Sequence, residues 1–230
     1  MNNDFQNIKN LIIDYLGRNR VSTTEVADCL GKRGALEGII PCVQKNYQVG
    51  EIAWFYAYSE SNWPLHEQIQ DMPEGKIVFV DEYGCNNRAI FGELVSKYMI
   101  LYRQSKAIIV NGKLRDAAAL IRQGWPIWCK GYTPVGCFNK KPELDVDIIW
   151  KSKQKEKYDG SIAVCDDCGV VIIEKENITN EFLLKLKNIE EQEDIWFDRL
   201  DHFKENTFDI VCQKKYLSDE IYMSRYNNEQ

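Results

Sequence analysis

The fold of this chain is decided by the segment Val78 to Gly136, which reads VFVDEYGCNNRAIFGELVSKYMILYRQSKAIIVNGKLRDAAALIRQGWPIWCKGYTPVG. An apolar run that ends at Asp81 predicts a buried strand, and the apolar spacing of residues 87–102 is helical. A second apolar run, residues 106–110, predicts another strand, which the turn-forming pair Asn111-Gly112 ends. The order of these elements predicts a central β-α-β-α-β unit.

Two parts of this unit carry groups that could bind a ligand. Gly92 to Val95 lies near the start of the predicted helix, where free backbone N–H groups and the helix dipole favour an anion such as a carboxylate. Arg115 and Asp116 follow the second turn. A guanidinium can fork onto a carboxylate or enolate oxygen, and a carboxylate is a hard ligand suited to magnesium or manganese. Together the pair could bind a chelating 2-oxo acid.

Several short motifs resemble those of the RraA-like family, which comprises regulator of ribonuclease activity A and the 4-hydroxy-4-methyl-2-oxoglutarate aldolases, often mislabelled demethylmenaquinone methyltransferases. Their order and spacing carry the resemblance, which covers most of residues 20–200. The matching pieces are FGEL ending at Leu94, NGKLRD at Asn111 to Asp116, the pattern P.W..G.TP.G from Pro126 to Gly136, DGSIAVCDDCGVVII at Asp159 to Ile173, and STTEVADCLGKRG from Ser22.

The resemblance implies an α/β fold. We expect an RraA-like swivelling β/β/α-type sandwich with the central β-α-β-α-β unit, N-terminal helices and a long C-terminal helix. The 230 residues fit one compact domain with a modest appendage. We therefore predict a single domain over residues 1–208 and a C-terminal tail, residues 209–230, that contacts a neighbouring subunit or frays.

Other elements follow from apolar periodicity and capping patterns. Ser22-Thr23-Thr24-Glu25 is a capping box and predicts a helix that runs to Leu30. Further helices are predicted at residues 5–16, 62–71 and 177–204, and strands at residues 52–58, 146–150, 162–165 and 170–173. The basic residues from Lys151 to Lys157 are interpreted as a solvated charged loop.

The resemblance also implies a reaction. It indicates a divalent-metal-dependent carbon-carbon lyase, of the class II pyruvate-type aldolase or oxaloacetate decarboxylase kind, that acts on a 2-oxo acid through a metal-stabilised enolate. Asp116 would bind the cation, most simply Mg or Mn, and Arg115 would steady the enolate. The amides of Gly92, Glu93, Leu94 and Val95 would hold the substrate carboxylate. Glu93 would also orient metal-bound water or assist proton transfer.

A neighbouring subunit is expected to complete such a site. In the family, a glutamate on the C-terminal helix of an adjacent subunit often does so, and Glu193 is the best match here, with Glu190 and Glu191 as competitors. Because the resembled proteins form trimeric rings or dimers of trimers, we expect a homo-trimer or hexamer.

The sequence departs from the family pattern at several positions. Glu93 stands where carbon-carbon-cleaving members usually have Asp, and its distance along the chain to Arg115 is one residue longer. Ala119 occupies a position where some members have an acid. The Lys-rich segment 139–158 lacks the usual PGD pattern. These differences bear on the substrate more than on the fold.

Other functions also fit the sequence. One is a non-catalytic oligomeric binding protein that regulates a ribonuclease or another partner, since fold similarity alone does not establish catalysis. Another is a Schiff-base aldolase that uses Lys113 or Lys76, although no desolvating pattern marks either lysine. Structural roles are open as well: Asp116 could cap a helix beside a surface arginine, and Glu93 could complement a helix dipole.

Composition indicates the partners and the cellular compartment to expect for this protein. The net charge of −6 and the pI of about 5.2 give no general attraction to nucleic acid. The sequence shows no signal peptide and no apolar stretch long enough to span a membrane, so we expect a cytoplasmic protein. Its eight cysteines would then be reduced thiols. Cys165 and Cys168 have metal-ligand spacing, but with only two histidines in the chain a turn between strands is favoured over a zinc site.

Overall fold

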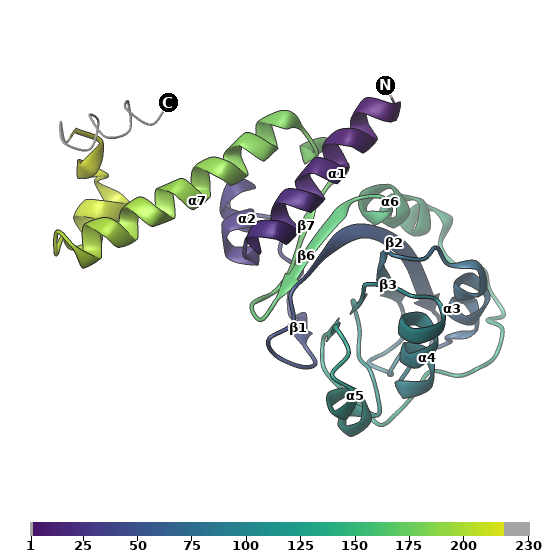
Figure 1. Cartoon of the computed structure of the whole chain (residues 1–230). Coiled ribbons are helices and arrows are strands. Elements are labelled where there is room, and N and C mark those ends of the chain that lie inside the picture. Colours follow the sequence, from purple (N-terminus) through teal and green to yellow (C-terminus); the bar gives the residue numbers. More distant parts are fainter. Residues whose placement is uncertain (1, 219–230) are drawn as a thin grey trace. The chain divides into compact units, whose positions relative to one another are not determined.

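A seven-stranded sheet with the order β1-β5-β4-β3-β2-β6-β7 forms the framework of residues 2–218, the part of the chain that the computed structural model describes (Figure 1). β2, β3, β4 and β5 pair in parallel, whereas β1, β6 and β7 join antiparallel. The carboxyl ends of the parallel strands therefore meet at one edge. The strands are β1 (Ile40–Pro41), β2 (Gln48–Tyr58), β3 (Ile77–Tyr83), β4 (Ala107–Val110), β5 (Ile127–Cys129), β6 (Ile162–Asp166) and β7 (Gly169–Ile173).

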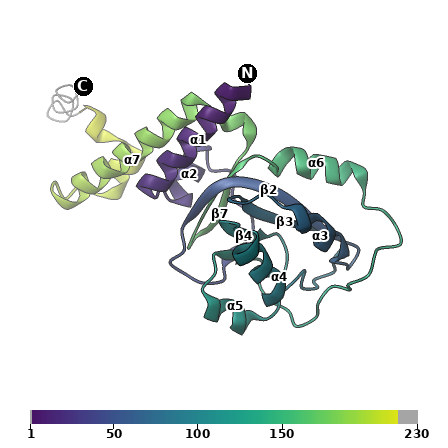
Figure 2. The same cartoon turned by 45° about the vertical axis from the view of Figure 1, so that its right-hand side comes forward.

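The sheet curves until its two ends nearly meet. Figure 2 shows the bend of β2, which pairs with β6 through its first residues and with β3 through the rest. The indole N–H of Trp128 in β5 donates to the carbonyl of Asp166 in β6 at 2.8 Å. Ala35 forms a bridge with Val171 of β7. These contacts make the sheet nearly closed.

Helices α1 to α6 lie along the outside of this sheet (Figures 1 and 2). The π-helical turn Tyr98–Tyr102 directly continues α4. A second π-helical turn, Phe208–Cys212, follows α7 after a short loop. The α-helices are α1 (Asn2–Asn19), α2 (Thr23–Cys29), α3 (Trp63–Gln68), α4 (Glu93–Lys97), α5 (Ala117–Gln123), α6 (Ile148–Tyr158) and α7 (Asn180–Asp201), and single 3₁₀ turns occur at Ile69–Asp71, Lys175–Asn177 and Lys215–Ser218.

The central strands are apolar on both faces. Val78 and Val80 of β3 pack into a core with residues of α3, α4 and α5, while Ile77 and Phe79 face a second core that includes Tyr158 of α6. Successive side chains of a strand point to opposite faces, and both faces of a covered parallel sheet must be apolar. This explains the uninterrupted apolar runs in β3 and β4.

The fold class and the central unit are confirmed. β3, α4, β4, α5 and β5 follow in the predicted order with parallel pairing. The capping box is present too: Ser22 Oγ accepts from Glu25 N at 3.2 Å, and Ser22 N donates to Glu25 Oε2 at 2.7 Å. The predicted N-terminal and C-terminal helices correspond to α1 and α7.

The strand predicted at residues 146–150 is wrong, because this segment opens helix α6. Asp147 Oδ1 accepts from the N–H groups of Ile149 and Trp150, at 2.8 and 3.1 Å, and so caps the helix. Ile148 and Ile149 are 70% and 77% exposed, so the apolar run is not a buried strand. The basic residues 151–157 are accordingly helical rather than a loop.

The helix predicted from residue 87 begins later, at Glu93. Asn86 and Asn87 have positive φ values of 51° and 60°, which a helix does not allow. Ala89 instead forms parallel bridges with Lys113 and Gly136. Tertiary pairing thus takes up the residues that apolar spacing assigned to the helix.

The chain divides into two compact units, Met1–Leu183 and Leu184–Gln230. In the second unit, the hydroxyl of Tyr216 accepts from Gln192 Nε2 at 3.2 Å and from Trp196 Nε1 at 3.1 Å. Part of the predicted tail is therefore packed on α7. The domain boundary predicted at residue 208 stays a prediction, and residues 219–230 lie outside the described part. Between residues 2 and 218, no helix has the length and apolar character to cross a membrane.

Candidate functional site

The segment Asn111–Asp116 lies between two other backbone segments at the carboxyl edge of the parallel strands. On one side, Arg115 N donates to the carbonyl of Phe91 at 3.0 Å. On the other, Leu114 N donates to the carbonyl of Gly131 at 2.9 Å. Arg115 and the residue before it are thus held by backbone bonds from both sides.

Asp81 fixes the beginning of this segment, although it is not among the predicted site residues. Its side chain is only 3% exposed, and Oδ1 accepts from Asn111 Nδ2 at 2.7 Å and from Glu82 N at 3.0 Å. Burial raises the pKa of the Asp81 carboxyl. The signal available in the sequence was a polar residue at the end of an apolar run, which often marks the functional edge of a sheet.

Asp116 joins the two corners of the predicted site. It precedes α5 with left-handed backbone angles, φ 60° and ψ 35°, and its side chain makes no capping bond to α5. Instead, Asp116 Oδ2 accepts from Glu93 N at 3.1 Å. The carboxylate therefore lies at the first amide of α4, where a helix favours negative charge. The helix-cap interpretation of Asp116 holds for α4 and not for the helix that Asp116 precedes.

Two glycines allow the backbone to lie directly against Arg115 and Asp116. A Cβ at Gly92 would overlap Asp116 Oδ2 and come within 2.8 Å of Arg115 Cγ. A Cβ at Gly136 would lie 3.0 Å from Arg115 Nη1. Gly92 has φ −145°, so close contact rather than backbone conformation requires glycine there.

Gly92→Ala should therefore lower stability and displace the Asp116 carboxylate. We expect the free energy of unfolding to fall by about 1 to 2 kcal/mol, because the methyl group forces Asp116 away from Glu93 N. Chemical denaturation of the purified variant measures this change. Gly17→Ala is the matched control, since its Cβ would meet only Val49 Cγ1 at 3.4 Å within helix α1. Equal stability of the two variants would contradict the close approach.

Arg115 and Asp116 are open to solvent. Arg115 Nε lies 3.9 Å from Asp116 Oδ2, and the two side chains are 51% and 45% exposed. An ion pair that is this exposed contributes little to stability, about 0 to 1 kcal/mol. The two side chains are thus accessible to a ligand from the same side of the fold.

The N-terminus of α4 supplies further donors. The first bond within the helix runs from Ser96 N to the carbonyl of Gly92 at 3.1 Å, so the amides of Leu94 and Val95 precede it. Leu94 is exposed, whereas the side chain of Val95 is buried. Glu93 points toward α5, where its Oε1 accepts from Gln123 Nε2 at 3.3 Å.

The donor set around Asp116 decides which cation could bind. Asp116 Oδ2 is engaged by Glu93 N, which leaves the second carboxylate oxygen as a ligand. In residues 2–218, no three His, Cys, Asp or Glu side chains are grouped as a metal site would require. Magnesium is commonly held by one or two carboxylates, with water and substrate oxygens as its other ligands. The second oxygen of Asp116 therefore suits an oxygen-seeking cation of this kind, and metal binding there stays a prediction.

Glu193 lies in the second unit, on α7. It lines an apolar hollow of about 220 Å³ with residues of α7 and of the turn that follows. Its contribution to the site of a neighbouring subunit, with Glu190 and Glu191 as competitors, stays a prediction.

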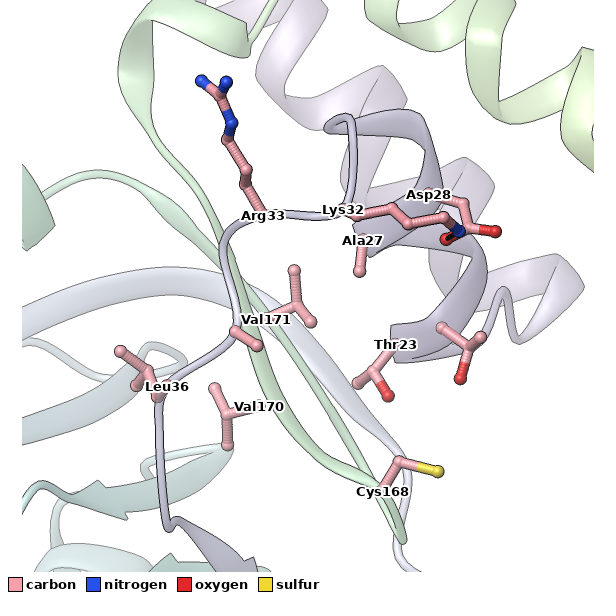
Figure 3. Close-up of a pocket in the computed structure, with 11 residues that line it drawn as sticks. Thr23, Ala27, Asp28, Lys32, Arg33, Leu36, Cys168, Val170 and Val171 are labelled. Carbon is pink, nitrogen blue, oxygen red and sulfur yellow. Dashed lines mark hydrogen bonds and ion pairs between the residues drawn. The ribbon is translucent and has the colours of Figure 1, made fainter.

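A hollow of about 310 Å³ between α2 and β7 contains none of the predicted site residues (Figure 3). Its charged side chains include Lys32 and Asp28, whose Nζ and Oδ1 atoms are 2.5 Å apart, while Arg33 points away from the other side chains. Cys168 lies exposed at the predicted turn between β6 and β7, whereas Cys165 is buried within β6. The two thiols of the Cys165–Cys168 pair therefore occupy different environments.

Sequence comparison identifies the family. The sequence profile of the RraA-like family, described as Aldolase/RraA, matches residues 23–172. The chain belongs to the RraA-like family. The matched region contains β1 to β6, most of β7, and every predicted site residue except Glu193 and its competitors.

Solved structures share the RraA-like fold. An uncharacterized protein from Pseudomonas syringae pv. tomato str. DC3000 matches with TM-score 0.63 and 19% identity, over 83% of this chain and 92% of its own. Streptomyces coelicolor RraAS2, described as an unusual member of the RNase ES inhibitor RraA protein family, matches with TM-score 0.62 and 23% identity, over 81% and 96%. The RNA-processing inhibitor RraA from Thermus thermophilis matches with TM-score 0.51 and 21% identity, over 66% and 91%. At these identities the likeness establishes the fold alone.

Proposed function

We propose that this RraA-like protein is a divalent-metal-dependent carbon-carbon lyase that acts on a 2-oxo acid, as an aldolase or a decarboxylase. One observation carries the proposal. Arg115, Asp116 and the N-terminus of α4 converge, with Asp116 Oδ2 3.1 Å from Glu93 N and both charged side chains about half exposed. A cationic fork, a hard carboxylate ligand and free amides are the groups that a chelating 2-oxo acid requires.

Each of these groups has a distinct task. Asp116 would hold magnesium or manganese through its second carboxylate oxygen. The cation, when bound, would supply Lewis acidity toward the oxygens of the 2-oxo acid. Arg115 would offer two N–H groups to the oxygen on which negative charge develops, and such fixed donors lower the barrier because they need no reorganisation.

The substrate carboxylate would meet the start of α4. The amides of Leu94 and Val95 precede the first hydrogen bond of the helix, so no carbonyl of an earlier turn accepts from them. The positive end of the helix dipole also favours an anion there. Glu93 is held near this point by Gln123, which leaves its second oxygen to move a proton or orient water. A carboxylate can serve as such an acid or base when it lies within hydrogen-bonding distance of the substrate.

The Schiff-base alternative is disfavoured by the surroundings of one candidate lysine. Lys76 Nζ lies 2.6 Å from Glu51 Oε2. The ammonium group is engaged by this carboxylate, whereas a Schiff-base lysine must present its amine to the carbonyl of the substrate. Borohydride treatment in the presence of substrate tests both lysines, since it would trap an adduct on Lys76 or Lys113.

Oxaloacetate decarboxylation tests the proposal directly. We expect the purified protein to consume oxaloacetate with added magnesium or manganese, and to lose this activity above the metal-only background after exhaustive chelation. Activity should return when either cation is added back but not when a monovalent salt is added, which would support dependence on a divalent cation. Pyruvate release coupled to a dehydrogenase measures the rate.

The opposite outcome points to the second candidate function. Activity that survives chelation would contradict the metal-dependent mechanism. No activity on any simple 2-oxo acid would favour a non-catalytic oligomeric binding protein, in keeping with the inhibitor descriptions of the Streptomyces coelicolor and Thermus thermophilis structures. Both candidates are compatible with a homo-oligomer, which remains part of the proposal.

A further inference from the structure

Two cysteines that are far apart in the sequence touch each other in the fold. The Sγ atoms of Cys42 and Cys129 lie 3.6 Å apart and share a hydrogen bond. Cys129 ends β5, and Cys42 directly follows β1, where its N–H donates to the carbonyl of Ile127 at 2.8 Å. The antiparallel pairing of β1 with β5 thus holds both thiols in place. Because Cys129 is paired with Ile40 and Cys42 lies two residues further along, the thiols meet diagonally across the two strands.

We propose that Cys42 and Cys129 form a peroxide-reactive dithiol, in which Cys42 is oxidised first and Cys129 then closes a disulfide. The pair suits these two roles because its members differ in exposure. Cys129 is 1% exposed, whereas Cys42 is only partly buried and can meet a small oxidant. A hydroperoxide is the class of oxidant that a protein thiolate attacks.

The electrostatics support this order of reaction. The hydrogen bond from Cys129 outweighs the effect of burial and, with a further contribution from Tyr132, lowers the pKa of the Cys42 thiol. The same hydrogen bond and burial raise the pKa of Cys129. Since the thiolate is the nucleophile, Cys42 is the thiol that reacts first with an oxidant.

The reaction balances with hydrogen peroxide as the oxidant. The Cys42 thiolate attacks one peroxide oxygen, so that an S–O bond forms, the O–O bond breaks, and the leaving hydroxide takes up a proton to become water. The Cys129 sulfur then attacks the sulfur of the Cys42 sulfenic acid. An S–S bond forms, the S–O bond breaks, and water leaves with the proton of Cys129. Two thiols lose two electrons, and one peroxide becomes two water molecules.

The surrounding chain can accommodate the product. A disulfide brings two sulfurs to about 2.05 Å, so the Sγ atoms must approach by roughly 1.5 Å. Pro41 and Trp128 are paired at the very end of β1, and Cys129 leads into the loop that carries Gly131. The two Sγ atoms thus lie where a two-residue strand ends and a loop begins.

Tryptic digestion separates the relevant thiols. Cys42 is the single cysteine of peptide 34–45, and Cys129 is the single cysteine of peptide 123–130. The full-length reduced protein is treated with hydrogen peroxide, its remaining thiols are alkylated under denaturing acidic conditions, and the digest is analysed by mass spectrometry without reduction. We expect peptides 34–45 and 123–130 to appear as one linked species, two hydrogens lighter than their sum and lost on treatment with dithiothreitol.

A neighbouring pair provides an internal comparison. Cys85 and Cys137 influence each other's pKa, and their tryptic peptides, 77–88 and 131–140, also contain one cysteine each. A side-chain hydrogen bond also links Cys85 with Cys137, and the Sγ–Sγ distance of 3.6 Å belongs to Cys42 and Cys129. Linkage confined to Cys85 and Cys137 would overturn the proposal, as would free Cys42 in a sample whose exposed Cys168 and Cys212 are oxidised.

Variants separate the two roles. In Cys129→Ser, the Cys42 sulfenic acid should persist and be trapped by dimedone, whereas Cys42→Ser should give no adduct at residue 129. Cys212→Ser, in the other unit, should leave the linked peptide unchanged. Circular dichroism tests the folding of each variant. The digest of the wild-type protein tests the disulfide even if a variant does not fold. Equal trapping at Cys42 in wild type and Cys129→Ser would show that Cys129 does not close the disulfide.

Discussion

Asp116→Asn is expected to abolish metal-dependent turnover of oxaloacetate while leaving the fold intact. In the wild type, Glu93 N donates to Asp116 Oδ2 at 3.1 Å, and the side-chain oxygen of asparagine can accept the same bond. Asparagine lacks, however, the negative charge that attracts a cation. A Lewis acid contributes several kcal/mol to such a reaction, and each 1.4 kcal/mol is about tenfold in rate, so we expect a loss of about a thousandfold.

The choice of asparagine separates chemistry from stability. Residue 116 has φ 60°, a region that Asn tolerates better than other residues, whereas Ala there would add strain of its own. The free energy of unfolding of the metal-free variant should stay within about 0.5 kcal/mol of wild type, as measured by chemical denaturation. A variant that keeps its turnover, or loses turnover only because it unfolds, would remove Asp116 as the metal ligand.

Arg115→Lys should lower turnover by about one hundredfold or more. Lysine keeps the positive charge but lacks the planar fork that can offer two N–H groups to one oxyanion, and removal of one such donor typically has an effect of this size. Steady-state rates at saturating oxaloacetate and fixed metal concentration measure the change. Stability should hardly alter, because Arg115 is 51% exposed and its ion pair with Asp116 is weak.

Arg122→Lys is the matched control for this substitution. Arg122 is exposed near the end of α5, the helix that follows the Arg115-Asp116 pair, and it makes no contact that the proposal uses. Its change should leave turnover within about twofold of wild type. Equal rates for the two arginine variants, together with an active Asp116→Asn, would withdraw the lyase proposal and favour the binding protein.

The central architecture could be predicted from the sequence because it depends on local patterns. The apolar runs that became β3 and β4 are buried on both faces, so their composition identifies them without knowledge of their neighbours. The Ser22 capping box is likewise complete within four residues. Asn111-Gly112 and the Arg115-Asp116 pair follow the strand at fixed spacing, which allowed the candidate site to be named.

Local patterns failed where distant segments compete. Residues 87–92 have helical spacing, yet Ala89 pairs with Lys113 and Gly136, and this tertiary pairing outweighs helical propensity. The segment 146–150 has the apolar run of a strand, but no strand within residues 2–218 pairs with it, and Asp147 caps a helix instead. The first outcome depends on residues far apart in the sequence, whereas the second rests on a local cap that apolar spacing alone does not reveal.

Sequence patterns predicted the β-α-β-α-β unit and placed Gly92, Arg115 and Asp116 at its corners. Only the tertiary structure decided that the Asp116 carboxylate meets α4 rather than α5, that Gly136 lies against Arg115, and that the thiols of Cys42 and Cys129 touch. A strand that is buried on both faces must be apolar at every position, so its own composition identifies it. Side-chain partners are set by which strand ends the folded sheet brings together.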